Sequence, residues 1–196
     1  MRPLAAVAWW WCCCAAARGA RRPVLENVGL VVRPRPLTPA RAAMLRRLRG
    51  SGVARARLLA YGGAEVAATV AALGGGARVA VSVPDDEVAA VAGAGGAADA
   101  ACAAFAAHAR SGAVDLAVVG VTPPSGVGAD VRHYEALANA TRNLAVACAR
   151  ANATVAVSTA FALNVLRSSY PPSASLFAAP GPLRPVLEHL RATRSP

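Results

Sequence analysis

Residues 78–92, RVAVSVPDDEVAAVA, contain two secondary-structure patterns, one before Pro84 and one after it. The first six residues, 78–83, alternate valine with small residues and predict a buried strand. After Pro84, the acids at 85–87 favour the start of a helix, with an aspartate cap and negative charge near its N-terminus. A strand that runs directly into a helix is the repeating unit of alternating α/β folds.

The same alternation continues on both sides of this stretch. It predicts strands at 28–32, 56–60, 114–121 and 154–158, and helices at 39–50, 64–73, 130–150 and 182–191. The first of these helices is well marked, because Thr38 can cap it, Pro39 takes its first position and Gly50 closes it. Five apolar runs separated by helices predict parallel strands with right-handed crossovers. Either a doubly wound sheet or part of a barrel fits this order.

Cofactor and metal motifs are missing from the sequence. No spaced glycines follow the first predicted strand, which reads VGLVVRPRP over 28–36, so no dinucleotide site is expected. The glycine-rich segment 93–101, GAGGAADAA, follows a helix and is predicted to be a loop. His108, His133 and His189 fall on three separate predicted helices without ligand spacing, so we expect no metal.

The charge of the chain is strongly positive. Its 196 residues include 21 basic and 10 acidic side chains, for a formal net charge of +11, and every basic residue is arginine. Such charge can neutralise phosphates. The arginines are dispersed, however, and no aromatic platform is interleaved with them, so we expect no nucleic-acid partner. Attraction to a polyanionic extracellular matrix is another use of the same charge.

The N-terminus has the features of a secretory signal. Arg2 precedes an apolar run from Leu4 to Ala17 that ends in small residues. We predict a signal peptide at 1–17, with cleavage as late as residue 20 as a variant, and a mature domain at 18–196. The product would be extracellular or in the cell wall. The run is too short for a stable membrane span, although the WWWCCC within it leaves a retained anchor as the alternative.

Secretion bears on four further residues. Asn139 and Asn152 each begin an Asn-Ala-Thr acceptor sequence for N-glycosylation. Cleavage of the signal would leave Cys102 and Cys148 as the cysteines of the mature chain. A bridge between them needs Cα atoms within about 7 Å. Both lie in alanine-rich helical stretches, and we expect two separate buried thiols.

Several segments occur in an order that is itself informative. They are VGLVV at 28–32, VAVSVPDDEVAAVA at 79–92, VDLAVVG at 114–120, VAVSTAFALNVLRSSYPPSASLF at 155–177 and LRPVLEHLRATRSP at 183–196. In this order the chain resembles the N-terminal part of plant glucan endo-1,3-β-glucosidases, glycoside hydrolase family 17. The resemblance implies a secreted (β/α)8 barrel that hydrolyses β-1,3-glucan with a carboxylic acid and a carboxylate nucleophile at the carboxyl ends of barrel strands.

The sequence departs from this family at the sites that matter for catalysis. Thr122 stands at the family's proton-donor position. A hydroxyl cannot serve as a general acid near neutral pH, and this loss removes a factor of about 10² to 10⁴ in rate. Asp85 stands where the family usually has Asn, and Tyr170 is the aromatic residue of the SYPPS loop. Both are candidate substrate-binding residues, although we expect the Tyr170 ring to pack against the protein.

The resemblance covers roughly five of eight barrel units, and the family's nucleophile lies beyond them. We therefore expect an incomplete barrel that is catalytically inactive, with β-1,3-glucan or another cell-wall polysaccharide as partner and no cofactor. Two alternatives remain open. One is a non-catalytic extracellular β-glucan-binding or wall-binding protein, and the other is a fragment with no independent fold.

Overall fold

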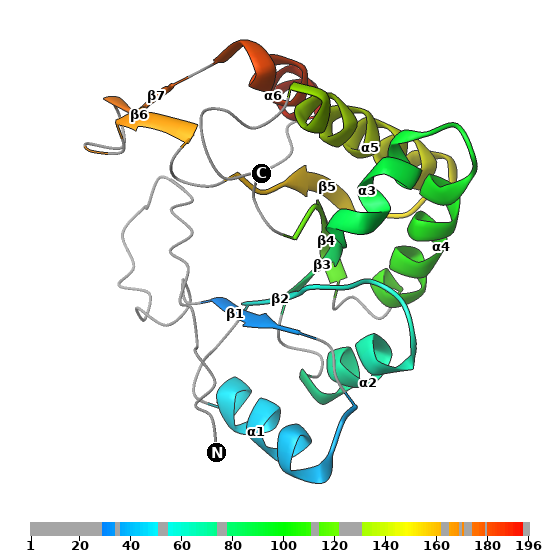
Figure 1. The fold of residues 1–196 in the computed structure, drawn as a ribbon. Helices are drawn as coiled ribbons and strands as arrows, with labels where there is room; N and C mark the ends of the chain where they lie inside the picture. Colours follow the sequence, from blue (N-terminus) through cyan, green and yellow to red (C-terminus); the bar gives the residue numbers. More distant parts are fainter. Residues whose placement is uncertain are drawn as a thin grey trace, which may run out of the picture.

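Five parallel strands form the centre of the protein (Figure 1). They are β1 (Gly29–Val32), β2 (Arg55–Leu58), β3 (Arg78–Val83), β4 (Val114–Val119) and β5 (Ala156–Thr159), paired in that order. This computed structural model describes residues 29–33, 36–50, 55–73, 78–110, 114–121, 131–161, 165–168, 170, 174–178 and 180–193. Within those residues β1 and β5 are the two edges of the sheet, which does not close into a barrel. The predicted α/β class with parallel strands is confirmed.

Helices cover one face of this sheet. They are α1 (Pro39–Gly50), α2 (Ala64–Leu73), α3 (Asp85–Ala92), α4 (Ala97–Ala109) and α5 (Val131–Arg150), while α6 (Pro180–Thr193) packs against α5 and belongs to a separate apolar cluster. In Figure 1, α1 and α2 lie beneath β1 and β2, whereas α3, α4 and α5 lie beside the later strands. Alternate strand residues such as Leu58, Val81 and Val119 are buried against the helices in one continuous core. Their neighbours in sequence face the opposite side of the sheet, because strand side chains alternate.

The bounds of three predicted strands needed correction. The second strand begins and ends earlier than the predicted 56–60, and the fifth begins and ends later than the predicted 154–158. The fourth ends at Val119 rather than at 121, because Gly120 has φ 84 and turns the chain out of the sheet. The third strand and the helix at 64–73 have the predicted bounds.

The crossover from β3 to β4 contains two helices. The prediction of a loop at 93–101 was wrong beyond Gly96, since α4 begins at Ala97. Gly96 has φ 74, a left-handed conformation that glycine adopts without strain, and the chain bends by 120° between α3 and α4. No described helix is by itself long and apolar enough to cross a membrane, and only this bent pair meets the length and composition criteria when its two helices are joined.

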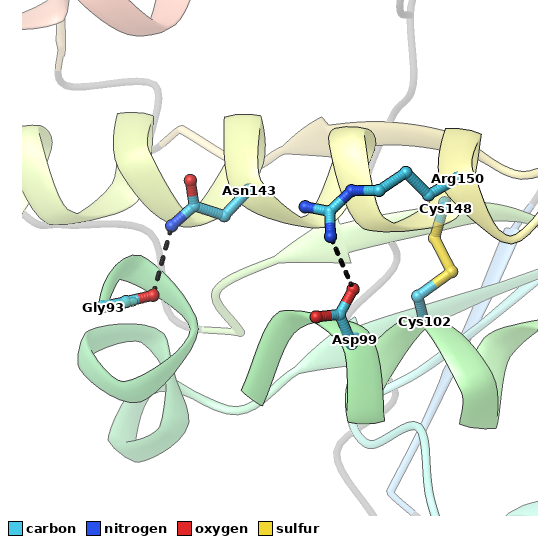
Figure 2. Close-up of polar contacts among 6 residues, drawn as sticks. All are labelled: Gly93, Asp99, Cys102, Asn143, Cys148 and Arg150. Atoms are coloured by element: carbon cyan, nitrogen blue, oxygen red, sulfur yellow. Dashed lines mark hydrogen bonds and ion pairs between the residues drawn. A yellow bond between two sulfur atoms is a disulfide. The ribbon is translucent and has the colours of Figure 1, made fainter. Parts of the chain in front are cut away.

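A disulfide joins α4 to α5 (Figure 2). Cys102 and Cys148 have Cα atoms 5.3 Å apart and are bonded through their sulfur atoms. The prediction of two separate thiols was therefore wrong. The physical reason is that α4 and α5 pack side by side, which brings two residues 46 positions apart into bonding geometry.

Polar contacts add to this connection among α3, α4 and α5. Arg150 forms an ion pair with Asp99 of α4, with 3.6 Å between Nη1 and Oδ1. The side-chain amide of Asn143 lies at the C-terminal end of α3, where it donates to the carbonyl oxygens of Val91, Ala92 and Gly93 at 3.1, 3.0 and 3.4 Å (Figure 2 draws the contact with Gly93). These contacts satisfy carbonyls that a helix end leaves without partners.

A short antiparallel hairpin follows the sheet. Its arms are β6 (Leu166–Ser168) and β7 (Leu176–Phe177), which bound the proline-containing segment that was predicted as a surface loop. A second, smaller apolar cluster anchors the hairpin to α5 and α6 through Tyr134, Val165 and Leu183. The hairpin is thus attached to the helices beyond β5, away from β1 and β2 (Figure 1).

Candidate functional site

A groove of about 700 Å³ lies where the first four strands end. Each strand contributes the residues that directly follow it, because parallel strands end at one edge of the sheet. This is the edge at which barrel enzymes bind their substrates. The lining consists of Arg33, Leu59, Ala60, Gly62, Gly63, Glu65, Pro84, Asp85, Asp86 and Val121. One arginine faces three carboxylates there, so the lining has a formal charge of −2.

Asp85 has a different role from the predicted helix cap. Pro84 occupies the N-cap position of α3, and no side chain caps the helix. Asp85 is the first helical residue, and its Oδ1 accepts the backbone N–H of Val121 at 2.7 Å. The aspartate therefore connects the start of α3 to the end of β4.

Arg57 completes this connection from the sheet. Its side chain emerges from β2 on the face opposite the helices, where Nε donates to Ser82 Oγ at 3.0 Å and Nη2 donates to the Gly120 carbonyl at 2.8 Å. Burial lowers the pKa of the guanidinium, and the nearby charge of Asp85 opposes that shift. The carbonyl of Gly120 and the N–H of Val121 belong to one peptide unit. Arg57 and Asp85 therefore hold the two sides of the same peptide.

This held peptide directly precedes position 122. Thr122, which the sequence analysis expects at the family's proton-donor position, lies outside the described residues. Gly120 has φ 84, a backbone conformation that residues with a Cβ rarely adopt. The end of β4 is thus fixed by the hydrogen bonds of Arg57 and Asp85 and by a conformation that favours glycine. Sequence analysis missed Arg57, and the available signal was a charged residue inside a short strand.

A second polar pair supports the loop after β2. The Tyr61 hydroxyl donates to Glu87 Oε2 of α3, and the Tyr61 ring packs at 5.0 Å between centroids against Phe105 of α4. Burial, and then the hydrogen bond and charge of Glu87, raise the pKa of Tyr61 to about 12. The tyrosine remains a neutral donor at physiological pH, and Glu87 is occupied in this contact.

The structure separates the other predicted site residues. Tyr170 lies on the hairpin segment outside the groove lining and is 85% exposed, so the expected packing of its ring was wrong. The hairpin extends this residue into solvent, and Ser168 Oγ donates to its carbonyl at 3.0 Å. Asn139 and Asn152 are both exposed. The histidines lie on α4, α5 and α6 as predicted, and the described residues contain no cluster of side chains that could hold a metal ion.

Known structures with a similar fold were found, although no protein family model and no curated protein matches the chain. A β-1,3-glucanase and allergen of Cryptomeria japonica pollen superposes with a TM-score of 0.68 at 21% identity, over 81% of this chain and 50% of that one. A structure from a study of two plant β-glucan endohydrolases with distinct substrate specificities gives a TM-score of 0.59 at 24% identity, over 79% and 49%. The chain shares the fold of plant β-glucan hydrolases and spans about half their length.

Proposed function

We propose that this chain binds β-1,3-glucan in the groove at the carboxyl ends of β1 to β4 and does not hydrolyse it. The observation that carries the proposal is the position of the groove, which lies at the substrate-binding edge of a fold shared with a β-1,3-glucanase. The lining combines small apolar residues with one arginine and three carboxylates, which can donate hydrogen bonds to sugar hydroxyls and accept them.

The absence of hydrolysis is argued from the roles of the carboxylates. Retaining hydrolysis needs two carboxyl groups about 5 Å apart on opposite sides of the scissile bond, one of them held as an acid. Asp85 accepts the Val121 N–H, and Glu87 accepts the Tyr61 hydroxyl. Glu65 and Asp86 are exposed in the first turns of α2 and α3, where negative charge stabilises a helix. The described end of β4, Val119 to Val121, carries no carboxylate.

Binding and turnover are tested together on one substrate. The purified chain is mixed with insoluble β-1,3-glucan, with β-1,4-glucan as the control, and both bound protein and released reducing sugar are measured. We expect retention on the β-1,3-glucan alone and no sugar release. Failure to bind would remove the proposed function. Sugar release that persists after Asp85 and Asp86 are replaced together by Asn would show that other groups catalyse the reaction, and release of any kind would overturn the claim of inactivity.

We propose further that the chain is secreted and glycosylated at Asn152 in preference to Asn139. Asn152 and Thr154 are both exposed, in the turn that follows α5. In the other acceptor sequence, Thr141 is fully buried inside α5, where its hydroxyl donates to the Leu137 carbonyl at 2.7 Å. Glycopeptide mass spectrometry of the protein expressed through a secretory pathway measures the two occupancies, and higher occupancy at Asn139 would contradict this order.

A further inference from the structure

The last helix is attached to the protein mainly through one neighbour. α6 packs against α5, and its Leu183 belongs to the smaller apolar cluster with Tyr134 and Val165 rather than to the core of the sheet. The arms of the β6–β7 hairpin pack on the same cluster through Leu166 and Phe177. α6 and the hairpin therefore form one unit beyond β5, which we call the C-terminal unit (Figure 1).

Two features make the C-terminal unit less tightly held than the core. Pro185 lies inside α6, where it cannot donate a backbone hydrogen bond to the preceding turn. A cavity of about 210 Å³ lies where Thr193, at the end of α6, meets α5 and the start of β5. Segments with fewer packed contacts open at a lower free energy than the rest of a fold, so this unit can open by itself.

A histidine with an unsatisfied ring nitrogen lies where α6 packs on α5. Of the buried side-chain nitrogens and oxygens in the described residues, only Nε2 of His189 lacks a hydrogen-bond partner. His189 is three residues after the fully buried Val186 and four before Thr193, so it lies on the packed side of α6. Burial and then the positive charge of Arg142 on α5 lower the pKa of His189.

The other charged groups around this interface offer a protonated His189 no acceptor. On α6 itself, Glu188 pairs with Arg184 at 2.7 Å. On α5, Glu135 is exposed and lies two turns, about 10 Å, before Arg142. The remaining described groups are cationic or turned away: Arg191 on α6 and Arg167 on the hairpin add positive charge, His133 is two and a half turns from Arg142 on the opposite side of α5, and residues 151–161 carry no ionisable side chain.

We propose that protonation of His189 releases the C-terminal unit from α5, while the sheet and the helices α1 to α5 stay folded. Protonation places a second positive charge beside Arg142 and leaves a buried N–H without an acceptor, which costs more than burying the neutral ring. The attachment is therefore complete above pH 6.5 and weakens as the pH falls. This inference does not depend on glucan binding, because the groove is lined by residues that follow β1 to β4.

Hydrogen exchange of the full chain, measured by mass spectrometry at pH 7.5 and pH 5.0, tests this release. Protection factors are compared, so that the intrinsic pH dependence of exchange cancels. We expect the protection of β6, β7 and α6 to fall severalfold at pH 5.0. The upper limit is about thirtyfold, because pH 5.0 lies 1.5 units below the ordinary histidine pKa of 6.5. Strands β2 to β4 should keep their protection.

Three variants separate the histidine from its surroundings. His189→Leu keeps an apolar side chain in the interface and cannot take up a proton, so it should abolish the fall in protection. Arg142→Gln removes the repelling charge and should reduce the fall. His108→Leu removes a histidine from α4 and should leave the fall unchanged. Circular dichroism at pH 7.5 checks that each variant is folded.

Three results would overturn this proposal. An equal fall in strands β2 to β4 would show that acid unfolds the whole protein rather than the C-terminal unit. A fall that persists in His189→Leu would assign the release to other groups, and no fall in the unaltered chain would remove the release itself. Should His189→Leu be unfolded at pH 7.5, an undiminished fall in Arg142→Gln overturns the proposal in its place.

Discussion

Replacing both Cys102 and Cys148 with alanine should destabilise the protein by about 4 kcal/mol. The disulfide joins residues 46 apart in sequence. Closing a loop of that size lowers the entropy of the unfolded chain by an amount equivalent to about 4 kcal/mol at 25 °C. Both residues are almost fully buried between α4 and α5, so the alanines also remove two packed sulfur atoms, and the reduced chain measures the loop closure by itself. For a chain of this length the melting temperature should fall by about 8–16 °C.

Chemical denaturation of the oxidised chain, the reduced chain and the double variant measures this effect. The reduced chain should resemble the double variant, because both lack the loop closure. The bridge itself is checked by trypsin digestion without reductant, since cleavage after arginine yields the peptides 79–110 and 143–150 as one linked species. A difference in unfolding free energy below about 1 kcal/mol, or the absence of the linked species, would refute the reasoning.

Three further predictions concern the groove and the pH dependence of stability. Asp85→Ala should cost about 1–2 kcal/mol in denaturation, because it leaves the Val121 N–H without its acceptor, and Asp85→Asn should cost less. Tyr61 has a pKa raised from 10.0 to about 12, so its contribution to folding stability is complete below pH 10 and declines toward pH 12. Tyr61→Phe should flatten that decline. In an alkaline titration followed by phenolate absorbance, the same variant should lose the absorbance rise that occurs at the highest pH. Burial and then the charge of Arg142 lower the pKa of His189 from 6.5. The contribution of His189 to folding stability is therefore complete above pH 6.5 and declines as the pH falls. His189→Leu should reduce this loss of stability at acid pH in thermal melts, and Arg142→Gln should reduce it in part.

Local sequence patterns predicted the secondary structure of the core well. Valine-rich runs such as 78–83 predicted strands because buried parallel strands are apolar on both faces, and the structure has this strand with the same bounds. The errors fall where tertiary contacts decide. Gly120 ends β4 early through its backbone conformation, which an apolar run does not reveal. The hairpin arms β6 and β7 are too short to produce a periodic signal.

The candidate site was predictable in position but not in its interactions. The alternation of strands and helices correctly placed Asp85 at the edge where strands end. Its partner Val121 is 36 residues away, and Arg57 reaches Gly120 across 63 residues, so neither contact has a local signature. The disulfide was missed for the same reason, because helix propensity gives no information on which helices are neighbours.

The edges of the sheet determine how copies of this fold could associate through their strands. β1 and β5 run in the same direction at opposite sides of the sheet, so β5 of one molecule can extend the parallel order only by accepting β1 of the next. Such a contact is head-to-tail and leaves a new edge at each end of the assembly. Association that extends the parallel order would therefore produce rings or growing filaments, whereas a two-fold symmetric dimer through an edge needs antiparallel pairing of β1 with β1 or of β5 with β5.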